Sequence, residues 1–191
     1  MARSYDMSRR SAQAERTGER IVDATEALVA DGPLSEVTLS SIADGAGVTV
    51  QTVLRHMGSR EGCLEALGRR VATRIAEQRG HTEPGDTRAA IAELTAHYEA
   101  EGRLVLNLLS QEQGADATAA RAVAEGRAFH RAWVERCFDP VLPQPDEQTI
   151  DALVAATDLY VWKLLRLDLG RSRSETEAVI TRLTHTALEA S

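Results

Sequence analysis

Apolar residues recur at intervals of three and four along almost the whole chain, and the strict apolar–polar alternation of a half-buried strand is absent. This periodicity predicts an all-α fold. Nine helices are expected, at about residues 17–30, 38–46, from 49 onward, 59–79, 86–101, 103–113, 116–138, 146–169 and 174–189. Loops rich in glycine, proline and aspartate, at residues 80–86 and 139–146, separate the longer helices.

Composition excludes several classes of protein. The 191 residues are 43% hydrophobic and 27% charged, which is incompatible with a wholly disordered chain. No run of 18 apolar residues is present, so no membrane span is expected, and the N-terminus lacks the apolar segment of a signal peptide. We therefore expect a cytoplasmic protein that does not bind a membrane.

Enzyme and metal signatures are also missing. Cys63 and Cys137 form no CxxC pair, so each is expected to be a small buried residue rather than a zinc ligand or disulfide partner. The five histidines show no metal-ligand spacing, and GxSxG, P-loop and GxGxxG motifs are absent. We expect no catalysis, no metal and no cofactor.

Residues 38–57 carry the most specific local pattern, two short helices joined by a tight turn at residues 45–47. Ala43, Gly47 and Val53 have the spacing of a helix-turn-helix, in which the small residue allows close approach and the glycine allows a positive φ. Thr49 is a good N-cap for the second helix. The apolar wedge between the helices is expected to consist of Ile42, Val48 and Val53.

No acidic residue occurs between Thr49 and Arg60, although the formal net charge of the chain is −7. A surface that meets DNA phosphates requires such an acid-free stretch. The alternative is a solvated helix that happens to lack acids.

Residues 20–64 resemble the DNA-binding module of the tetracycline-repressor (TetR) family of transcriptional regulators. The matching positions are Arg20, Ile21, Ala24, Leu28, Thr38, Ile42, Ala43, Ala46, Gly47, Val48, Thr49, Thr52, Val53, His56, Ser59, Arg60, Glu61 and Leu64. Two positions depart from the family pattern. Leu54 replaces a tyrosine whose hydroxyl commonly holds a phosphate, and Met57 replaces a phenylalanine. Arg55 could supply the lost contact, to phosphate or to guanine.

The resemblance implies a nine-helix architecture with three parts. These are a flexible basic arm (1–16), a helix-turn-helix DNA-binding domain (17–58) and a helical effector-binding and dimerisation domain (59–191) that begins with a connecting helix (59–79). The arm could follow phosphates or enter a minor groove, or be a disordered tail. The residues expected at double-stranded DNA are Thr38, Ser40, Thr49, Val50, Gln51, Thr52, Arg55, His56 and Arg60.

The C-terminal helices of the family form a small-molecule pocket and a dimer interface, and the residues here permit both. The candidate pocket residues are His97, Tyr98, Phe129, His130, Trp133 and Trp162, a lining that suits an apolar or aromatic effector. The alternative is an ordinary core stripe with a hydrogen-bonded histidine. Helices at about 146–169 and 174–189 are apolar on several sides, which favours a two-fold, four-helix homodimer over intrachain core.

The implied function is that of a homodimeric repressor, released from a pseudo-palindromic operator by a small effector. The alternative from another class is a small all-helical ligand-binding protein or enzyme that does not bind DNA. That alternative leaves the acid-free stretch from Thr49 to Arg60 unexplained.

Overall fold

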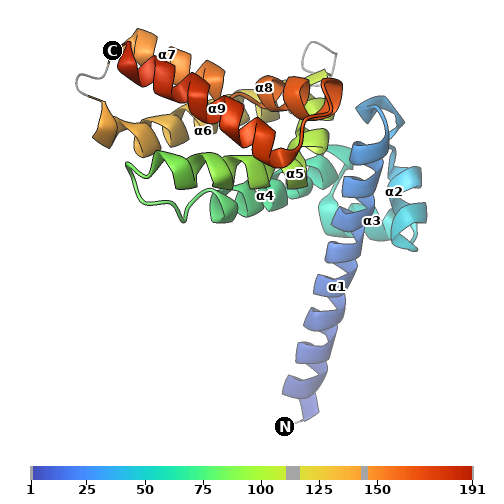
Figure 1. Ribbon diagram of the computed structural model, residues 1–191. Helices are drawn as coiled ribbons and strands as arrows, with labels where there is room; N and C mark the ends of the chain where they lie inside the picture. Colours follow the sequence, from blue (N-terminus) through green and yellow to red (C-terminus); the bar gives the residue numbers. More distant parts are fainter. Residues whose placement is uncertain (1, 111–116, 143–145, 191) are drawn as a thin grey trace. The chain divides into compact units, whose positions relative to one another are not determined.

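The computed structural model describes residues 2–110, 117–142 and 146–190, with side chains of the first helix from residue 11 and of the sixth from residue 120. Within these ranges the chain is helical and has no strand, which confirms the all-α prediction. The helices, labelled in Figure 1, are α1 (Ala2–Asp31), α2 (Leu39–Ala46), α3 (Val50–Met57), α4 (Arg60–Gln78), α5 (Thr87–Ser110), α6 (Ala117–Phe138), α7 (Glu147–Ala156), α8 (Leu159–Lys163) and α9 (Arg173–Glu189). Shorter turns are η1 (Leu34–Glu36), η2 (Asp139–Val141) and the π-helical η3 (Leu164–Asp168).

Three helices differ from the boundaries expected from sequence. The first begins at Ala2 rather than near residue 17, because no proline or glycine interrupts residues 2–17. The break expected in α5 near Gly102 does not occur, since that glycine makes room for the Trp162 ring, which would lie 2.8 Å from an added Cβ. The single helix expected at 146–169 is divided, because the Asp158 side chain accepts the N–H of Tyr160 and starts a new helix.

The chain forms two compact units. Unit 1 contains residues 1–72 and 107–120, and unit 2 contains residues 73–106 and 121–191. Helices α4 and α5 each contribute residues to both units. The two compact units thus divide within α4, and the functional domain boundary expected between residues 58 and 59 stays a prediction.

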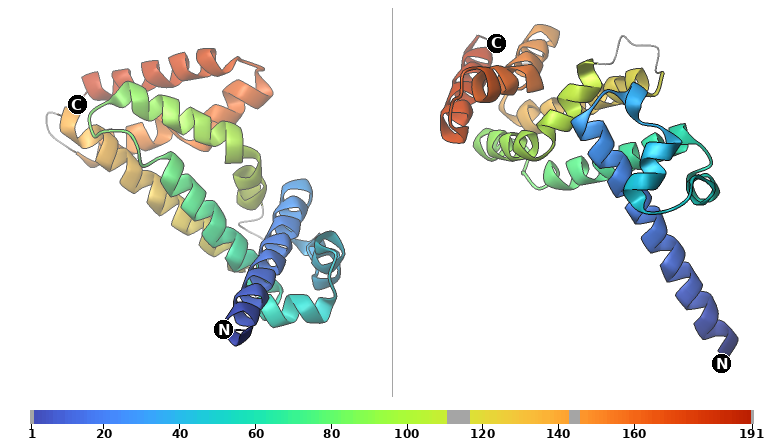
Figure 2. Two further views of the ribbon diagram at one scale, coloured as in Figure 1. Left: turned by 90° about the horizontal axis from the view of Figure 1, so that it is seen from below. Right: turned by 90° about the vertical axis from the view of Figure 1, so that its right-hand side faces the viewer.

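The core of unit 1 is aliphatic. Ile21 from α1, Ile42 from α2 and Val53 from α3 are fully buried, and both α2 and α3 contact α1. The right-hand view of Figure 2 shows α2 beside the C-terminal half of α1. Asn107, at the end of α5, donates from Nδ2 to the carbonyl oxygens of Val29 and Gly32 and so satisfies the end of α1. These contacts fix the frame on which α2 and α3 are presented.

The core of unit 2 joins α5, the η3 turn and α9. Ile91, Leu165 and Ile180 are buried together, with Val161 and Val179 packed against them. Both cysteines are free and buried, Cys63 in unit 1 and Cys137 in unit 2, which confirms the expectation that they are small core residues.

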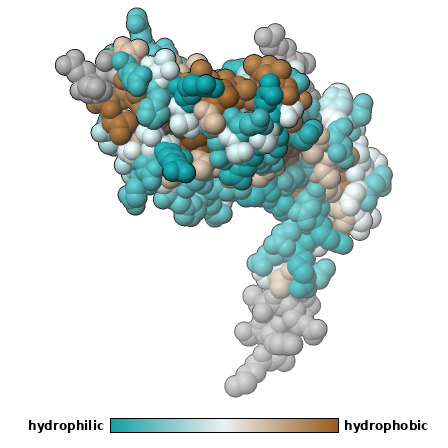
Figure 3. Space-filling model, viewed as in Figure 1, coloured by the Kyte–Doolittle hydropathy of each residue, from teal (hydrophilic) through white to brown (hydrophobic). Residues whose placement is uncertain are grey.

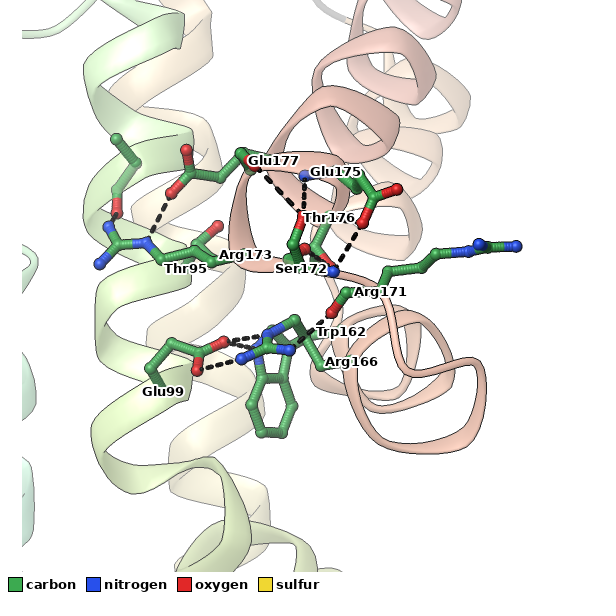
Figure 4. A network of polar contacts seen from close by, with 12 residues as sticks. Thr95, Glu99, Trp162, Arg166, Arg171, Ser172, Arg173, Glu175, Thr176 and Glu177 are labelled. Carbon is green, nitrogen blue, oxygen red and sulfur yellow. Dashed lines mark hydrogen bonds and ion pairs between the residues drawn. The ribbon is translucent and has the colours of Figure 1, made fainter.

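A carboxylate of α5 fixes η3 and the preceding helix (Figure 4). Glu99 accepts hydrogen bonds from Arg166 Nε at 2.6 Å and Nη2 at 2.8 Å, and from Trp162 Nε1 at 3.0 Å. The hydrogen bond from Arg166 is the main cause that lowers the pKa of Glu99. Because Arg166 lies in η3 and Trp162 in α8, this network sets which side chains of α8 and η3 face outward.

Candidate nucleic-acid interface

The first helix of the motif starts with a reciprocal cap. Thr38 Oγ1 accepts the backbone N–H of Ser41 at 3.0 Å, and Ser41 Oγ accepts the backbone N–H of Thr38 at 2.9 Å. The hydroxyl and the backbone N–H of Thr38, a residue expected at DNA, are therefore already engaged in the cap. Ser40, the next predicted contact, is exposed.

The turn has the predicted geometry. Gly47 has a φ of 63°, in the left-handed region that favours glycine, and Val48 donates to the carbonyl oxygen of Ala43 at 2.9 Å. Ile42 and Val53 are fully buried, and Val48 is half-buried. The predicted wedge thus fixes α3 against α2.

Helix α3 begins at the predicted N-cap. Thr49 Oγ1 accepts the N–H of Thr52 at 3.2 Å and lies 3.0 Å from its hydroxyl oxygen. Gln51 and Arg55 are exposed, and His56 is half-buried. A shallow depression of about 530 Å³ on this face is lined by Thr49, Gln51, Thr52, Leu54 and Arg55. The predicted α3 residues therefore share one accessible surface.

Two apolar side chains are exposed on the same face. Val50 keeps 38% of its surface accessible and Leu54 keeps 40%, although Val53 between them is fully buried. From sequence, Leu54 is notable only as the replacement for a tyrosine. Its i, i+4 spacing from Val50 is the signal that could have placed it beside the predicted contacts.

Arg60 takes part in the scaffold of the motif. Its Nε donates to the carbonyl oxygen of Val37 and its Nη2 to that of Leu34, both at 2.6 Å. These bonds join the start of α4 to the segment before α2. Arg60, which was expected at DNA, thus also holds the two ends of the helix-turn-helix together.

The six pocket residues predicted from sequence all lie in unit 2, around a cation that the sequence did not single out. Arg79, directly after α4, is only 4% exposed. Its guanidinium carbon lies 4.2 Å from the centroid of the Trp133 ring and 5.4 Å from that of Phe129. No sequence signal distinguished Arg79 from the other arginines near helix ends.

The two buried histidines of this cluster are neutral. Arg79 Nη2 donates to His130 Nδ1 at 2.9 Å, so the His130 proton lies on Nε2, which donates to Thr157 Oγ1 at 3.2 Å. Burial, followed by the charge of Arg79, lowers the pKa of His130 to about 3. The same two causes lower the pKa of His97 to about 3.

Tyr98 and Trp162 extend the cluster. The Tyr98 ring lies 5.2 Å from His97 and 6.0 Å from Trp162, centroid to centroid, and its hydroxyl donates to the Thr157 carbonyl oxygen at 2.9 Å. Burial raises the pKa of Tyr98. Thr157 therefore links the tyrosine to His130, and the six predicted residues form one aromatic and polar cluster with Arg79, in which Phe129 alone is exposed.

Two short helices at a glycine turn, the second exposed and free of acids, define a helix-turn-helix DNA-binding domain. Residues 21–67 match the family model described as bacterial regulatory proteins of the tetR family. This match supports assignment of the chain to the TetR family of regulators. No curated protein matches its sequence.

Solved structures agree in fold over nearly the whole chain. A transcriptional regulator from Rhodococcus sp. Rha1 superposes with a TM-score of 0.72 at 15% identity, over 91% of this chain and 96% of that one. A Clostridium perfringens protein assigned to the regulation of fatty acid metabolism gives a TM-score of 0.66 at 15% identity, over 89% and 97%. At this identity the likenesses establish the TetR-like fold. In the described part of the chain, no helix is long and apolar enough to cross a membrane, and no three metal-binding side chains gather.

Proposed function

We propose that this regulator is a homodimeric repressor that binds a pseudo-palindromic operator and is released by a small molecule bound in unit 2. The observation that carries the proposal is the exposed, acid-free face of α3. Recognition helices of this motif enter the major groove with their N-terminal residues, here Val50, Gln51 and Thr52. Gln51 pairs with adenine, and Val50 and Leu54 meet thymine methyl groups.

The proposed dimer uses an apolar surface of unit 2. Tyr160 and Leu164 are 52% and 50% exposed, Leu169 is 53% exposed, and Leu183 on α9 is 43% exposed. Figure 3 shows apolar surface gathered where α8 and α9 lie. Large side chains exposed together are unusual on a monomer and typical of an interface. A two-fold contact through this face brings two copies of α3 to one operator.

The proposed effector site is the cluster around Arg79. Its aromatic rings suit a small organic molecule, and its polar groups could orient one. A repressor of this kind is released when the effector binds more tightly to the conformation with lower DNA affinity.

The direct test is selection of binding sequences from random duplex DNA by the purified protein. A two-fold symmetric consensus with half-sites about one helical turn apart is the expected result. A variant with Gln51→Ala and Arg55→Ala should select nothing, while keeping the wild-type thermal midpoint. Absence of enrichment at low salt, with the protein folded, would reject DNA binding in favour of the ligand-binding alternative. A non-symmetric consensus would reject the dimer.

A further inference from the structure

We infer that unit 2 holds a binding site for a small organic monocarboxylate, centred on the guanidinium group of Arg79. The inference names the chemical class of the effector and rests on the proposed function. It replaces the purely apolar or aromatic effector expected from sequence, because the structure brings a cation into the aromatic cluster.

Arg79 is buried without a counter-ion among the described residues. It is 4% exposed, and no carboxylate forms an ion pair with it in the described part of the chain. Burial lowers the pKa of Arg79 to about 10. Tyr98, Cys137 and Glu93 each raise this pKa, and Glu93, the one carboxylate among them, has the smallest effect of the three. Arginine is almost never fully buried unless it is paired. An anion that enters the cluster would supply the missing charge.

The cluster contains unused hydrogen-bond donors. Arg79 Nε and Trp133 Nε1 are both buried, and neither has a hydrogen-bond partner among the described residues. Buried polar atoms in native proteins are nearly always bonded, so these two unbonded donors indicate an absent acceptor. Trp133 is 3% exposed and its ring stacks on the Arg79 guanidinium, so the two donors belong to one site. A carboxylate has two acceptor oxygens and no donor, which fits them.

The net charge of the site also favours a carboxylate. His97 and His130 are neutral at physiological pH, because burial and Arg79 lower both pKa values to about 3. Arg79 therefore supplies the positive charge that contacts the Trp133 and Phe129 rings. One positive charge balances a carboxylate, whereas a phosphate monoester would bring an excess of negative charge into a buried site.

The cluster also offers an apolar surround and a way in. Trp133 and Tyr98 are buried, whereas Phe129, whose ring centroid lies 5.4 Å from the guanidinium carbon, is 38% exposed. Movement of the Phe129 ring would open Arg79 to a ligand whose apolar body then contacts Trp133. The rings already stabilise the cation by cation–π contact. They do not supply the hydrogen-bond acceptors that Arg79 Nε and Trp133 Nε1 lack.

The test compares carboxylates with their uncharged amides. Phenylacetate, 2-naphthoate and octanoate are titrated by calorimetry at pH 7.4, each beside phenylacetamide, 2-naphthamide and octanamide. We expect at least one carboxylate to bind, and to bind about 100-fold more tightly than its amide. Failure of every carboxylate to bind, or equal binding of acid and amide, overturns the inference.

Variants locate the site. Arg79→Gln should weaken carboxylate binding about 100-fold, whereas Arg88→Gln, which removes an exposed charge of the same unit, should leave it unchanged. Trp133→Phe keeps the ring and removes one unused donor, and should weaken binding about 10-fold. It keeps the test valid if Arg79→Gln does not fold. Wild-type affinity in both site variants would overturn the inference.

Operator binding separates the two proposals. If the wild-type protein binds its operator but shows no preference for carboxylates over amides, the carboxylate site is overturned and the repressor function stands. If the protein binds carboxylates through Arg79 but selects no DNA sequence, the site is supported and the repressor function is overturned.

Discussion

Arg55 is the cation on the exposed face of α3, and the nearest acids in sequence are Asp44 and Glu61. Arg55→Ala should lower affinity for the selected operator by about 10- to 100-fold, because one base or phosphate contact is lost. Its exposure means that the thermal midpoint should not change. Gel-shift titration at several salt concentrations checks both parts. Arg88→Ala is the matched control for loss of one exposed arginine.

The salt series also distinguishes the partner of Arg55. A guanine contact gives a loss for the operator alone, whereas a phosphate contact gives an equal loss on random duplex and a salt slope that is smaller by about one. Unchanged operator affinity in a folded variant would remove Arg55 from the interface.

Arg60 supports the motif through two backbone carbonyl groups, those of Val37 and Leu34. Arg60→Gln should lower the free energy of unfolding by about 1 to 3 kcal/mol, because hydrogen bonds from a charged donor are lost. Urea denaturation followed by far-UV circular dichroism measures it. Wild-type stability together with a reduced salt slope for DNA binding would instead make Arg60 a phosphate ligand only.

Residues of the helix-turn-helix could be predicted from sequence because their roles are local. The positive φ of Gly47, the cap at Thr49 and the burial of Val53 follow from residue type and spacing within one short segment. The roles of Arg60 and Arg79 could not be predicted. Each depends on partners far away in sequence, such as Leu34 for Arg60 and His130 for Arg79.

At the scale of elements, the surface of α8, η3 and α9 carries the proposed dimer. Leu164→Glu places a charge at a side chain that is 50% exposed, so it should leave the fold intact and disrupt a two-fold apolar contact. We expect the dissociation constant of the dimer, measured by sedimentation equilibrium, to rise at least about 100-fold, with a parallel loss of operator affinity.

The matched control for this variant is Val141→Glu, because Val141 is 40% exposed in η2, outside the α8–η3–α9 surface. It should leave the dimer unchanged. A wild-type protein that sediments as a monomer, or equal dissociation of both variants, would contradict the proposed interface.

Helix existence was easier to predict than helix ends. The apolar period showed where helices run, but whether a small residue ends a helix depends on what packs against it. Gly102 continues α5 because the Trp162 ring lies against it, whereas Asp158 starts α8 because its side chain caps a free N–H. The first effect is a tertiary contact and the second depends on one hydrogen bond. The sequence pattern alone therefore could not tell which residue continues a helix and which one starts a new helix.

At the scale of the whole molecule, the buried histidines make stability depend on pH. The folded pKa values of His97 and His130 are about 3, whereas both groups titrate near 6.5 when unfolded. The unfolded chain thus binds more protons below pH 6.5. The free energy of unfolding should be constant above that pH and fall by about 2 kcal/mol per pH unit as pH decreases toward 4.

Urea titrations at pH 7.5, 6.5, 5.5 and 5.0 check this dependence. Tryptophan fluorescence reports on unit 2, since Trp133 and Trp162 are the two tryptophans of the chain. His97→Gln with His130→Gln should flatten the slope, and His81→Gln, at an exposed position, should not. An unchanged slope in the double variant would contradict the assignment to these histidines.

Coupling between a carboxylate in unit 2 and an operator on α3 has a limit set by thermodynamics. A ligand at a separate site can weaken operator binding only by the ratio of its affinities for the free and the DNA-bound protein, about 5- to 150-fold. The apparent operator Kd should therefore rise with carboxylate concentration and then level off. An anion that competes with DNA phosphates at Arg55 would instead raise the apparent operator Kd continuously, with no plateau as its concentration increases. Fluorescence anisotropy of a labelled operator distinguishes the two curves, and in Arg79→Gln the plateau should disappear while operator affinity without ligand stays at the wild-type value.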